Sequence, residues 1–262
     1  MTLTADPSTA AQAAPRGSAR RTSLIAGALY LLTFIASIPA LALYGPVLDD
    51  PGYVLGPGPD AGILWGGFLE LVTALACIGT AIVLFPILRR QNETTALGFV
   101  ASRTLEAATI VVGVVTLLAV VTLRQDLAGA TGAEATSLVV TGQALVAVHT
   151  WTFLLGPGFM AGVNALLLGS LLLRSRLVPR VIPALGLVGA PLLLASSTAT
   201  LFGAYSQLSV WSAIATIPIF LWELSLGLWL VVKGFTPSPL TAGTGDAGTP
   251  PPTAPPRIAE PA

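Results

Sequence analysis

Long apolar runs recur six times along this sequence, and each run is long enough to cross a lipid bilayer. A transmembrane helix needs about 20 residues, because the hydrocarbon core is about 30 Å thick and each helical residue rises about 1.5 Å. Lipid offers the backbone no hydrogen-bond partners, so a crossing segment must be helical. The sequence therefore predicts an all-α, polytopic transmembrane helix bundle. The expected membrane spans are residues 23–43, 63–88, 97–123, 153–173, 181–202 and 210–232.

The composition is that of a membrane protein rather than of a soluble domain. Of the 262 residues, 54% are hydrophobic and 9% are charged, whereas soluble domains contain about 25% charged residues. The net charge is zero, which excludes the basic field that attracts nucleic acid. The lipid bilayer is the predicted partner, no nucleic-acid partner is expected, and the oligomeric state stays open.

Residue types that carry catalysis or bind metals are scarce. His149 is the single histidine and Cys77 the single cysteine, which excludes a His-rich metal site, a conventional Ser–His–Asp triad and an intrachain disulfide. Cys77 is interpreted as a small buried hydrophobe. The sequence contains no phosphate-binding loop, zinc signature or dinucleotide fingerprint. We predict no catalytic residue, no metal and no cofactor, which weighs against an enzyme without deciding the matter.

Two tails of different composition flank the apolar region. Residues 1–19 lack apolar periodicity, and residues 236–262 are rich in Pro, Thr and Gly. Both compositions are typical of disordered segments. The expected organisation is a disordered cytoplasmic N-terminal tail, a transmembrane domain over residues 20–235, and a disordered C-terminal tail.

The positions of the basic residues predict how the chain is threaded. Cytoplasmic loops of membrane proteins carry an excess of Lys and Arg. If both termini are cytoplasmic, Arg124 is the sole basic residue in the loops of the opposite side. The Ala, Gly, Pro and Arg content suggests a GC-rich bacterial genome, so we predict a multi-pass protein of the bacterial cytoplasmic (inner) membrane. The basic residues on the predicted cytoplasmic side are Arg16, Arg20, Arg21, Arg89, Arg90, Arg103, Arg174, Arg176, Arg180 and Lys233.

Two segments allow alternative interpretations. Residues 138–151 are too few for a span and suit a short interfacial or re-entrant helix. As a seventh span they would carry the arginines of residues 174–180 to the opposite side, so the charge bias favours six spans. The first span also resembles a signal peptide that ends in A-x-A at Ala40 and Ala42. Its apolar stretch of about 20 residues exceeds the usual 7–15, which favours a retained helix.

Four polar side chains fall near the expected midplane of the bilayer. Arg103 and Glu106 share one face of a helix because three positions separate them. Asn164 and Glu223 reach a similar depth on helices that run the opposite way. An ionised group at this depth costs about 2.5–3.5 kcal/mol on insertion scales, so it must be paired, neutralised or solvated. Either these groups line a functional cavity, or Arg103 bridges Glu106 and Glu223 and locks the third span to the sixth.

Glu70 and His149 form a second set of polar candidates. Glu70 is expected nearer the outer side of the second span, and His149 near the outer interface. The sequence GPG at residues 156–158 permits a broken helix, but it is also typical of a loop or kink. Small residues at four-residue spacing, such as Ala161 and Ala165, predict close helix packing.

Three stretches of the sequence carry a recognisable pattern. They are "GGFLELVTALACIGTAIVLFPILRRQNETTALGFVASRTLEAATIVVG", "RLVPRVIPALGLVGAPLLLAS" and "FLWELSLGLWLVVKGF". Together they resemble a bacterial integral membrane family called domain of unknown function 4386, over roughly residues 20–235. The resemblance implies several membrane helices, including the first span, and no particular activity. Its R-x-x-E pattern falls on Arg103 and Glu106, E-L-x-x-A on Glu70, and W-E-x-x-x-G on Trp222, Glu223 and Gly227.

Two functional hypotheses follow for this uncharacterised type of protein. The first is a small-molecule or proton-coupled transporter, in which Glu106 and Glu223 face a midplane cavity that holds a small-molecule ligand. The second is a membrane scaffold or regulatory partner, in which the polar groups only fix helix packing. Many transporters contain internal repeats, and none is evident in this sequence, which weakens the first hypothesis. An intramembrane enzyme ranks last, because no nucleophile–base set is present.

Overall fold

The computed structural model of the chain describes residues 15–56 and 59–241. Within these ranges the protein is all-α, contains no strand, and has six helical segments long and apolar enough to cross a membrane. The predicted fold class is confirmed. In chain order the elements are α1 (Pro15–Asp49), α2 (Ala61–Leu88), α3 (Glu93–Asp126), α4 (Gly132–Phe153), the π-helix η1 (Leu154–Met160), α5 (Ala161–Ser175), α6 (Val181–Leu201), α7 (Val210–Val232) and the short 3-10 helix η2 (Pro239–Thr241).

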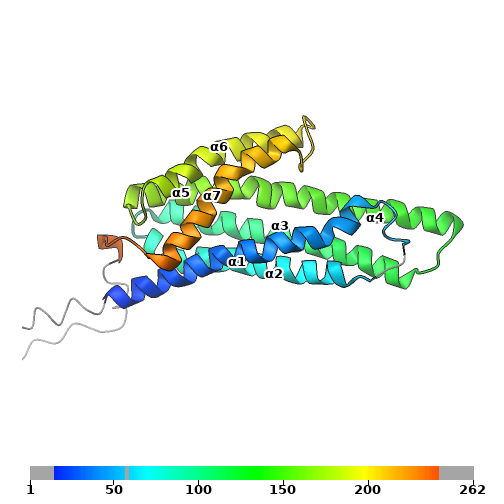
Figure 1. Cartoon of the computed structure of the whole chain (residues 1–262), viewed down its shortest axis with the longest axis horizontal. Helices are drawn as coiled ribbons and strands as arrows, with labels where there is room; N and C mark the ends of the chain where they lie inside the picture. The colour runs from blue at the N-terminus through cyan, green and yellow to red at the C-terminus, as the bar shows by residue number, and fades with distance from the viewer. Residues whose placement is uncertain (1–14, 57–58, 242–262) are drawn as a thin grey trace, which may run out of the picture.

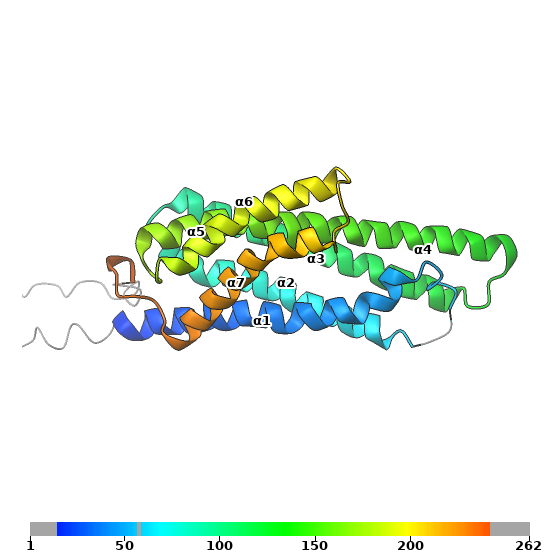
Figure 2. The same ribbon diagram turned by 45° about the horizontal axis from the view of Figure 1, so that its top comes forward.

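The helices run up and down along one long axis (Figure 1). The start of α1 and the end of α7 lie at the same end of the bundle, which we call the basic end because it carries the turns with Arg89, Arg90 and the arginines of residues 174–180. The opposite end is called the distal end. α6 and α7 form a shorter hairpin that crosses α1 near the basic end and leans away from it toward the distal end (Figures 1 and 2).

The fourth membrane segment is one continuous helical rod, which differs from the sequence prediction. Residues 138–151 do not form a separate interfacial or re-entrant helix; they belong to α4, which continues through η1 into α5 as 44 residues from Gly132 to Ser175. Pro157 lies inside η1, where the wider π turn accommodates a residue that would clash in an α-helix. At about 1.5 Å per residue the rod is about 66 Å long, roughly twice the hydrocarbon thickness.

The observed bounds overlap the predicted tails at both ends. α1 begins at Pro15, inside the range 1–19, and η2 lies inside the range 236–262. The Thr236 amide donates to the Leu177 carbonyl oxygen at 2.8 Å, and Arg90 donates to the Leu240 carbonyl oxygen at 3.3 Å. The rest of the predicted tails, residues 1–14 and 242–262, lies outside the described residues.

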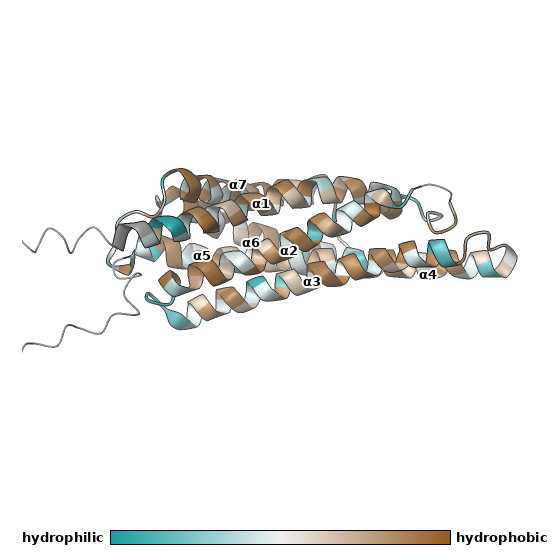
Figure 3. Ribbon diagram, turned by 90° about the horizontal axis from the view of Figure 1, so that it is seen from below, coloured by the Kyte–Doolittle hydropathy of each residue, from teal (hydrophilic) through white to brown (hydrophobic). Residues whose placement is uncertain are grey.

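The surface between the two ends is apolar. Figure 3 shows hydrophilic residues gathered toward the helix ends and hydrophobic residues along the lengths between them. Leu75 and Val188 are 70% and 62% exposed, which is the arrangement expected where lipid rather than water contacts the helices. Contact with a lipid bilayer follows from these segments.

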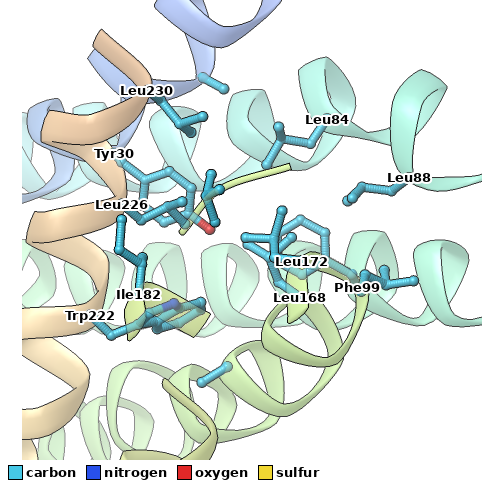
Figure 4. Close-up of a cluster of buried hydrophobic side chains, with 14 of the residues drawn as sticks. Tyr30, Leu84, Leu88, Phe99, Leu168, Leu172, Ile182, Trp222, Leu226 and Leu230 are labelled. Atoms are coloured by element: carbon cyan, nitrogen blue, oxygen red, sulfur yellow. The ribbon is translucent and has the colours of Figure 1, made fainter. Parts of the chain in front are cut away.

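A large apolar core fills the basic end of the bundle (Figure 4). Tyr30 of α1, Trp222 of α7 and side chains from α2, α3, α5 and α6 meet in it. Labelled members of this core are Tyr30, Leu84, Leu88, Phe99, Leu168, Leu172, Ile182, Trp222, Leu226 and Leu230. A second core, around Tyr44 and Leu117, lies nearer the distal end.

Small residues set the helix spacing that positions the polar groups. A Cβ atom added to Gly27 of α1 would lie 2.7 Å from the Gly227 carbonyl oxygen of α7. Gly186 of α6 faces the Trp222 indole at a similarly short distance, and the predicted packing residue Ala165 is completely buried. Because these helices approach so closely, α7 is held where Glu223 faces α3.

Candidate functional site

Arg103 is the centre of a buried ion-pair cluster. Its Nη1 atom lies 2.7 Å from Glu106 Oε2 and 3.6 Å from Glu223 Oε1. The Arg103 side chain is 2% exposed, and those of Glu106 and Glu223 are 7% and 14% exposed. The predicted bridge from Arg103 to both carboxylates, which joins α3 to α7, is confirmed.

Three further side chains complete the surroundings of the cluster. Asn164 Nδ2 donates to Glu106 Oε2 at 2.7 Å, so the predicted fourth member comes from α5. Arg103 Nε donates to Thr80 Oγ1 at 3.4 Å, and the guanidinium lies 5.2 Å from the centre of the Tyr30 ring. A cation over an aromatic face gains electrostatic energy, more so when it is desolvated. Side chains from five helices therefore surround the Arg103 guanidinium.

A cavity of about 240 Å³ opens next to this cluster. Arg103, Glu106 and Glu223 line it, together with Glu70 and Cys77 of α2. Along each of α1, α2, α3 and α7 the other lining residues lie on the distal side of the ion pairs, and the apolar core lies on the basic side. The cavity also has hydroxyl-bearing and aromatic walls: Thr33, Ser37, Thr73, Thr216, Phe34, Phe153 and Phe220.

Glu70 belongs to the same cavity as the midplane cluster. It is 7% exposed, and Tyr44 of α1 is the neighbour that interacts with its carboxylate. The Tyr44 ring occupies the space beside Gly66, one turn before Glu70. The two sets of candidates that the sequence separated are thus partly brought together.

His149 lies apart from the carboxylates. It is 4% exposed, its Nδ1 atom lies 3.3 Å from the Gly113 carbonyl oxygen, and its ring packs against Tyr44 and Phe153. A side chain on Gly113 would collide with His149 and Thr152. His149 therefore packs α4 against α3, and it does not line the cavity.

A second, smaller cavity of about 190 Å³ adjoins the first toward the distal end. The two cavities share the lining residues Phe153, Pro157, Leu193 and Thr216. The second cavity reaches Gln207 in the α6–α7 loop, and its polar lining is mostly hydroxyl-bearing: Ser196, Ser197, Thr200, Ser212 and Thr216. The π-helix η1 supplies part of the wall of both cavities.

An ion pair at the distal end ties the end of α3 to the loop between α1 and α2. Arg124 Nη1 lies 2.7 Å from Asp60 Oδ1, and Arg124 Nε donates to the Gly56 carbonyl oxygen at 2.9 Å. The Arg124 guanidinium lies 4.4 Å from the centre of the Tyr53 ring, and Gln125 donates to Asp60 at 2.8 Å. Burial raises the pKa of the Tyr53 hydroxyl, so this group stays a neutral donor to Asp60. This ion pair explains why the distal side carries a single arginine.

The model of the family described as domain of unknown function (DUF4386) matches residues 25–234. The chain belongs to the DUF4386 family. No curated protein and no solved structure matches it.

The family match covers every helix that lines the cavity. The matched range includes Glu70, Arg103, Glu106 and Glu223, which are the four charged side chains of the cavity. Residues far apart in the sequence thus meet at one site. Among the described residues, no group of three or more His, Cys, Asp and Glu side chains could hold a metal ion.

Proposed function

We propose that this DUF4386 protein is a small-molecule carrier of the bacterial inner membrane, with the central cavity as its binding site. The observation that carries the proposal is the cavity itself. A space of about 240 Å³, walled by four charged side chains in the apolar middle of a helix bundle, is costly unless a ligand or protons interact with it. Helix packing alone would favour a filled core.

The arrangement of the walls supports access from one side at a time. The hydroxyl-lined second cavity extends from the central cavity toward the distal end, and the apolar core closes the basic end. We further infer that the basic end lies in the cytoplasm, because it gathers the arginines. With this orientation, the cavity opens away from the cytoplasm. A carrier alternates between an outward-facing and an inward-facing state, and this structure is the outward-facing one.

The π-helix η1 is the element that supports a change between these states. Short π segments inside α-helices occur often at functional sites. η1 contributes Pro157 to both cavities and joins α4 to α5, which carries Asn164. A shift of α5 relative to α4 would change the contact between Asn164 and Glu106.

Access to the cavity from both membrane faces tests the carrier proposal. Cys77 is first replaced by alanine, since it lines the cavity, and Ser37→Cys is introduced into this background. The reagent is 2-(trimethylammonium)ethyl methanethiosulfonate, which does not cross membranes. We expect the thiol to react in right-side-out and in inside-out vesicles, because a carrier opens to each face in turn.

Two matched variants control this experiment. Val188→Cys lies on α6 and is 62% exposed on the lipid-facing surface, where the reagent does not reach it. Ala128→Cys lies in the distal α3–α4 loop and reports the orientation of each vesicle preparation. A Ser37→Cys thiol that reacts from one face only, or from neither, contradicts the carrier proposal.

The scaffold hypothesis is the second candidate, and one observation favours it. Glu106 is already satisfied by Arg103 of the same helix and by Asn164, which binds α5 to α3. A scaffold predicts that the Ser37→Cys thiol stays closed to at least one face. The same vesicles therefore separate the two candidates.

A further inference from the structure

The charge of the central cavity indicates which class of molecule it binds. This inference rests on the proposed function, because it names the substrate class of the same site. Three carboxylates and one guanidinium line the cavity, so negative charge is in excess when all are ionised. A buried charge needs a partner in an apolar environment. The excess is matched by a positively charged ligand.

Glu70 is the carboxylate whose charge the protein compensates least. Its neighbour Tyr44 is neutral, and no basic side chain of the described residues forms an ion pair with it. At 7% exposure it is also largely shielded from the solvent. Arg103, in contrast, already forms ion pairs with Glu106 and Glu223. An anionic ligand would therefore find no spare positive charge here.

The remaining walls suit a compact apolar body. Phe34 and Phe220 meet edge to face with ring centres 5.1 Å apart, and Phe153 lines the same space. The volume of about 240 Å³ is below the roughly 300–1,000 Å³ of pockets for drug-sized ligands. Ile38 and Phe220 are 57% and 39% exposed on the lipid-facing side of the cavity, where an amphipathic molecule in the bilayer meets them.

We propose that the cavity binds a small amphipathic amine. Glu70 holds its ammonium group, and Phe34, Phe153 and Phe220 line the space for its apolar part.

Three probes of equal size and different charge test this proposal. They are 2-amino-1-phenylethanol, which is a cation, 1-phenylethane-1,2-diol, which is neutral, and mandelate, which is an anion. Binding to the full chain in lipid nanodiscs is measured by calorimetry. We expect the amine to bind at least tenfold more tightly than the diol, and mandelate not to bind. Equal binding of the amine and the diol, preference for mandelate, or no binding of the amine overturns the proposal.

Variants of the walls assign the binding to this cavity. Glu70→Gln is expected to weaken amine binding at least tenfold, whereas Glu134→Gln, an exposed distal residue, leaves it unchanged. Ser37→Phe, which fills the cavity without removing a charge, gives the same loss and serves if Glu70→Gln is unstable. Monodispersity and thermal unfolding in the nanodiscs establish that each variant is folded. Unchanged amine affinity in folded Glu70→Gln or Ser37→Phe contradicts the site.

The failure of this inference is distinguishable from the failure of the carrier proposal. If the Ser37→Cys thiol reacts from both faces while the cavity prefers the diol or mandelate, the carrier stands and the substrate class is wrong. If the amine binds but the thiol reacts from one face only, the binding site stands and the carrier is wrong.

Discussion

At the scale of single residues, Arg103 holds the polar interior together. Its guanidinium contacts carboxylates on α3 and α7, a hydroxyl on α2 and the Tyr30 ring on α1. Removing one partner of a buried ion pair leaves an uncompensated charge, which costs about 3–5 kcal/mol. The stability of the bundle and the chemistry of the cavity therefore depend on the same side chain.

Replacing Arg103 tests this dependence. We expect Arg103→Met to lower the free energy of unfolding by about 3–5 kcal/mol, because Glu106 and Glu223 lose their counterion. Adding Glu106→Leu to Arg103→Met is expected to recover part of this loss. Reversible unfolding in mixed micelles measures both values. The control is Arg174→Met, which changes an exposed residue at the basic end and should alter the free energy of unfolding by no more than about 0.5 kcal/mol. If Arg174→Met destabilised the protein as much as Arg103→Met, the buried ion pair would lose its support.

Much of the cluster could be predicted from single residues, and some could not. The spacing of Arg103 and Glu106 and the depth of Asn164 and Glu223 identified the layer in which these groups meet. Glu70 was expected nearer the outer side, yet it lines the same cavity, which extends distally from the ion pairs. The sequence did not identify Thr80 and Tyr30 as neighbours of Arg103, because their positions depend on how the helices are rotated relative to each other.

At the scale of helices, the close contact between α1 and α7 at the basic end determines how the walls of the cavity are placed. Gly27 and Gly227 allow close approach at the basic end, and Arg20 donates to the Leu230 and Val231 carbonyl oxygens at 3.0 and 2.7 Å. Carbonyl groups in the last turn of a helix lack partners within the helix, and a cation there is favourable. Farther along, the two helices diverge and leave room for the cavity.

A methyl group at the crossing is expected to disturb it. Gly27→Ala would place Cβ within 2.7–2.8 Å of backbone atoms of Gly227 and Val231, which cannot move as a flexible side chain can. We expect destabilisation of about 1–3 kcal/mol, as for other overpacked sites. Gly45→Ala in the same helix is the control, because its nearest neighbour would be 3.8 Å away. Similar unfolding midpoints for the two variants would disprove the close contact.

Loss of Arg20 is expected to loosen the end of α7. Arg20→Ala removes three hydrogen bonds to carbonyl groups of the last turn, so amides in residues 226–235 should exchange faster with deuterium. Mass spectrometry of peptides measures the rate. The neighbouring Arg21 is exposed, and Arg21→Ala should leave the exchange unchanged. Equal rates in all three proteins would show that Arg20 does not cap this helix.

At the scale of the whole molecule, the two ends of the bundle differ in charge and in length. The basic end collects both described chain ends, while α1 to α4 extend at the distal end beyond the shorter α6–α7 hairpin (Figure 1). The charge bias favoured six crossings over seven, and the described residues contain six helical segments long and apolar enough to cross a membrane. The lengths of the helices at the distal end were not predictable from the sequence. In α4, for example, polar residues such as Glu134 and Gln143 lower the hydropathy, yet the helix continues through them.

Reporter fusions test the orientation of the molecule. With the basic end in the cytoplasm, a fluorescent protein fused after the C-terminus folds and emits light. Alkaline phosphatase inserted at Ala128 in the distal loop is active, because this enzyme works only outside the cytoplasm. The same insertion after Arg89, at the basic end, is inactive and serves as the control. Phosphatase activity after Arg89 would reverse the proposed orientation.

The seven-residue π segment between α4 and α5 also determines how the site tolerates changes in chain length. A π turn takes in about one residue more than an α turn. Deleting one residue from the segment, for instance Gly158, would therefore restore a regular α-helix and leave Asn164 facing Glu106. One residue inserted between the segment and Asn164 would instead turn Asn164 away from Glu106 by about 100°. The π segment thus lets this rod lose a residue while α5 keeps the face that meets the carboxylates.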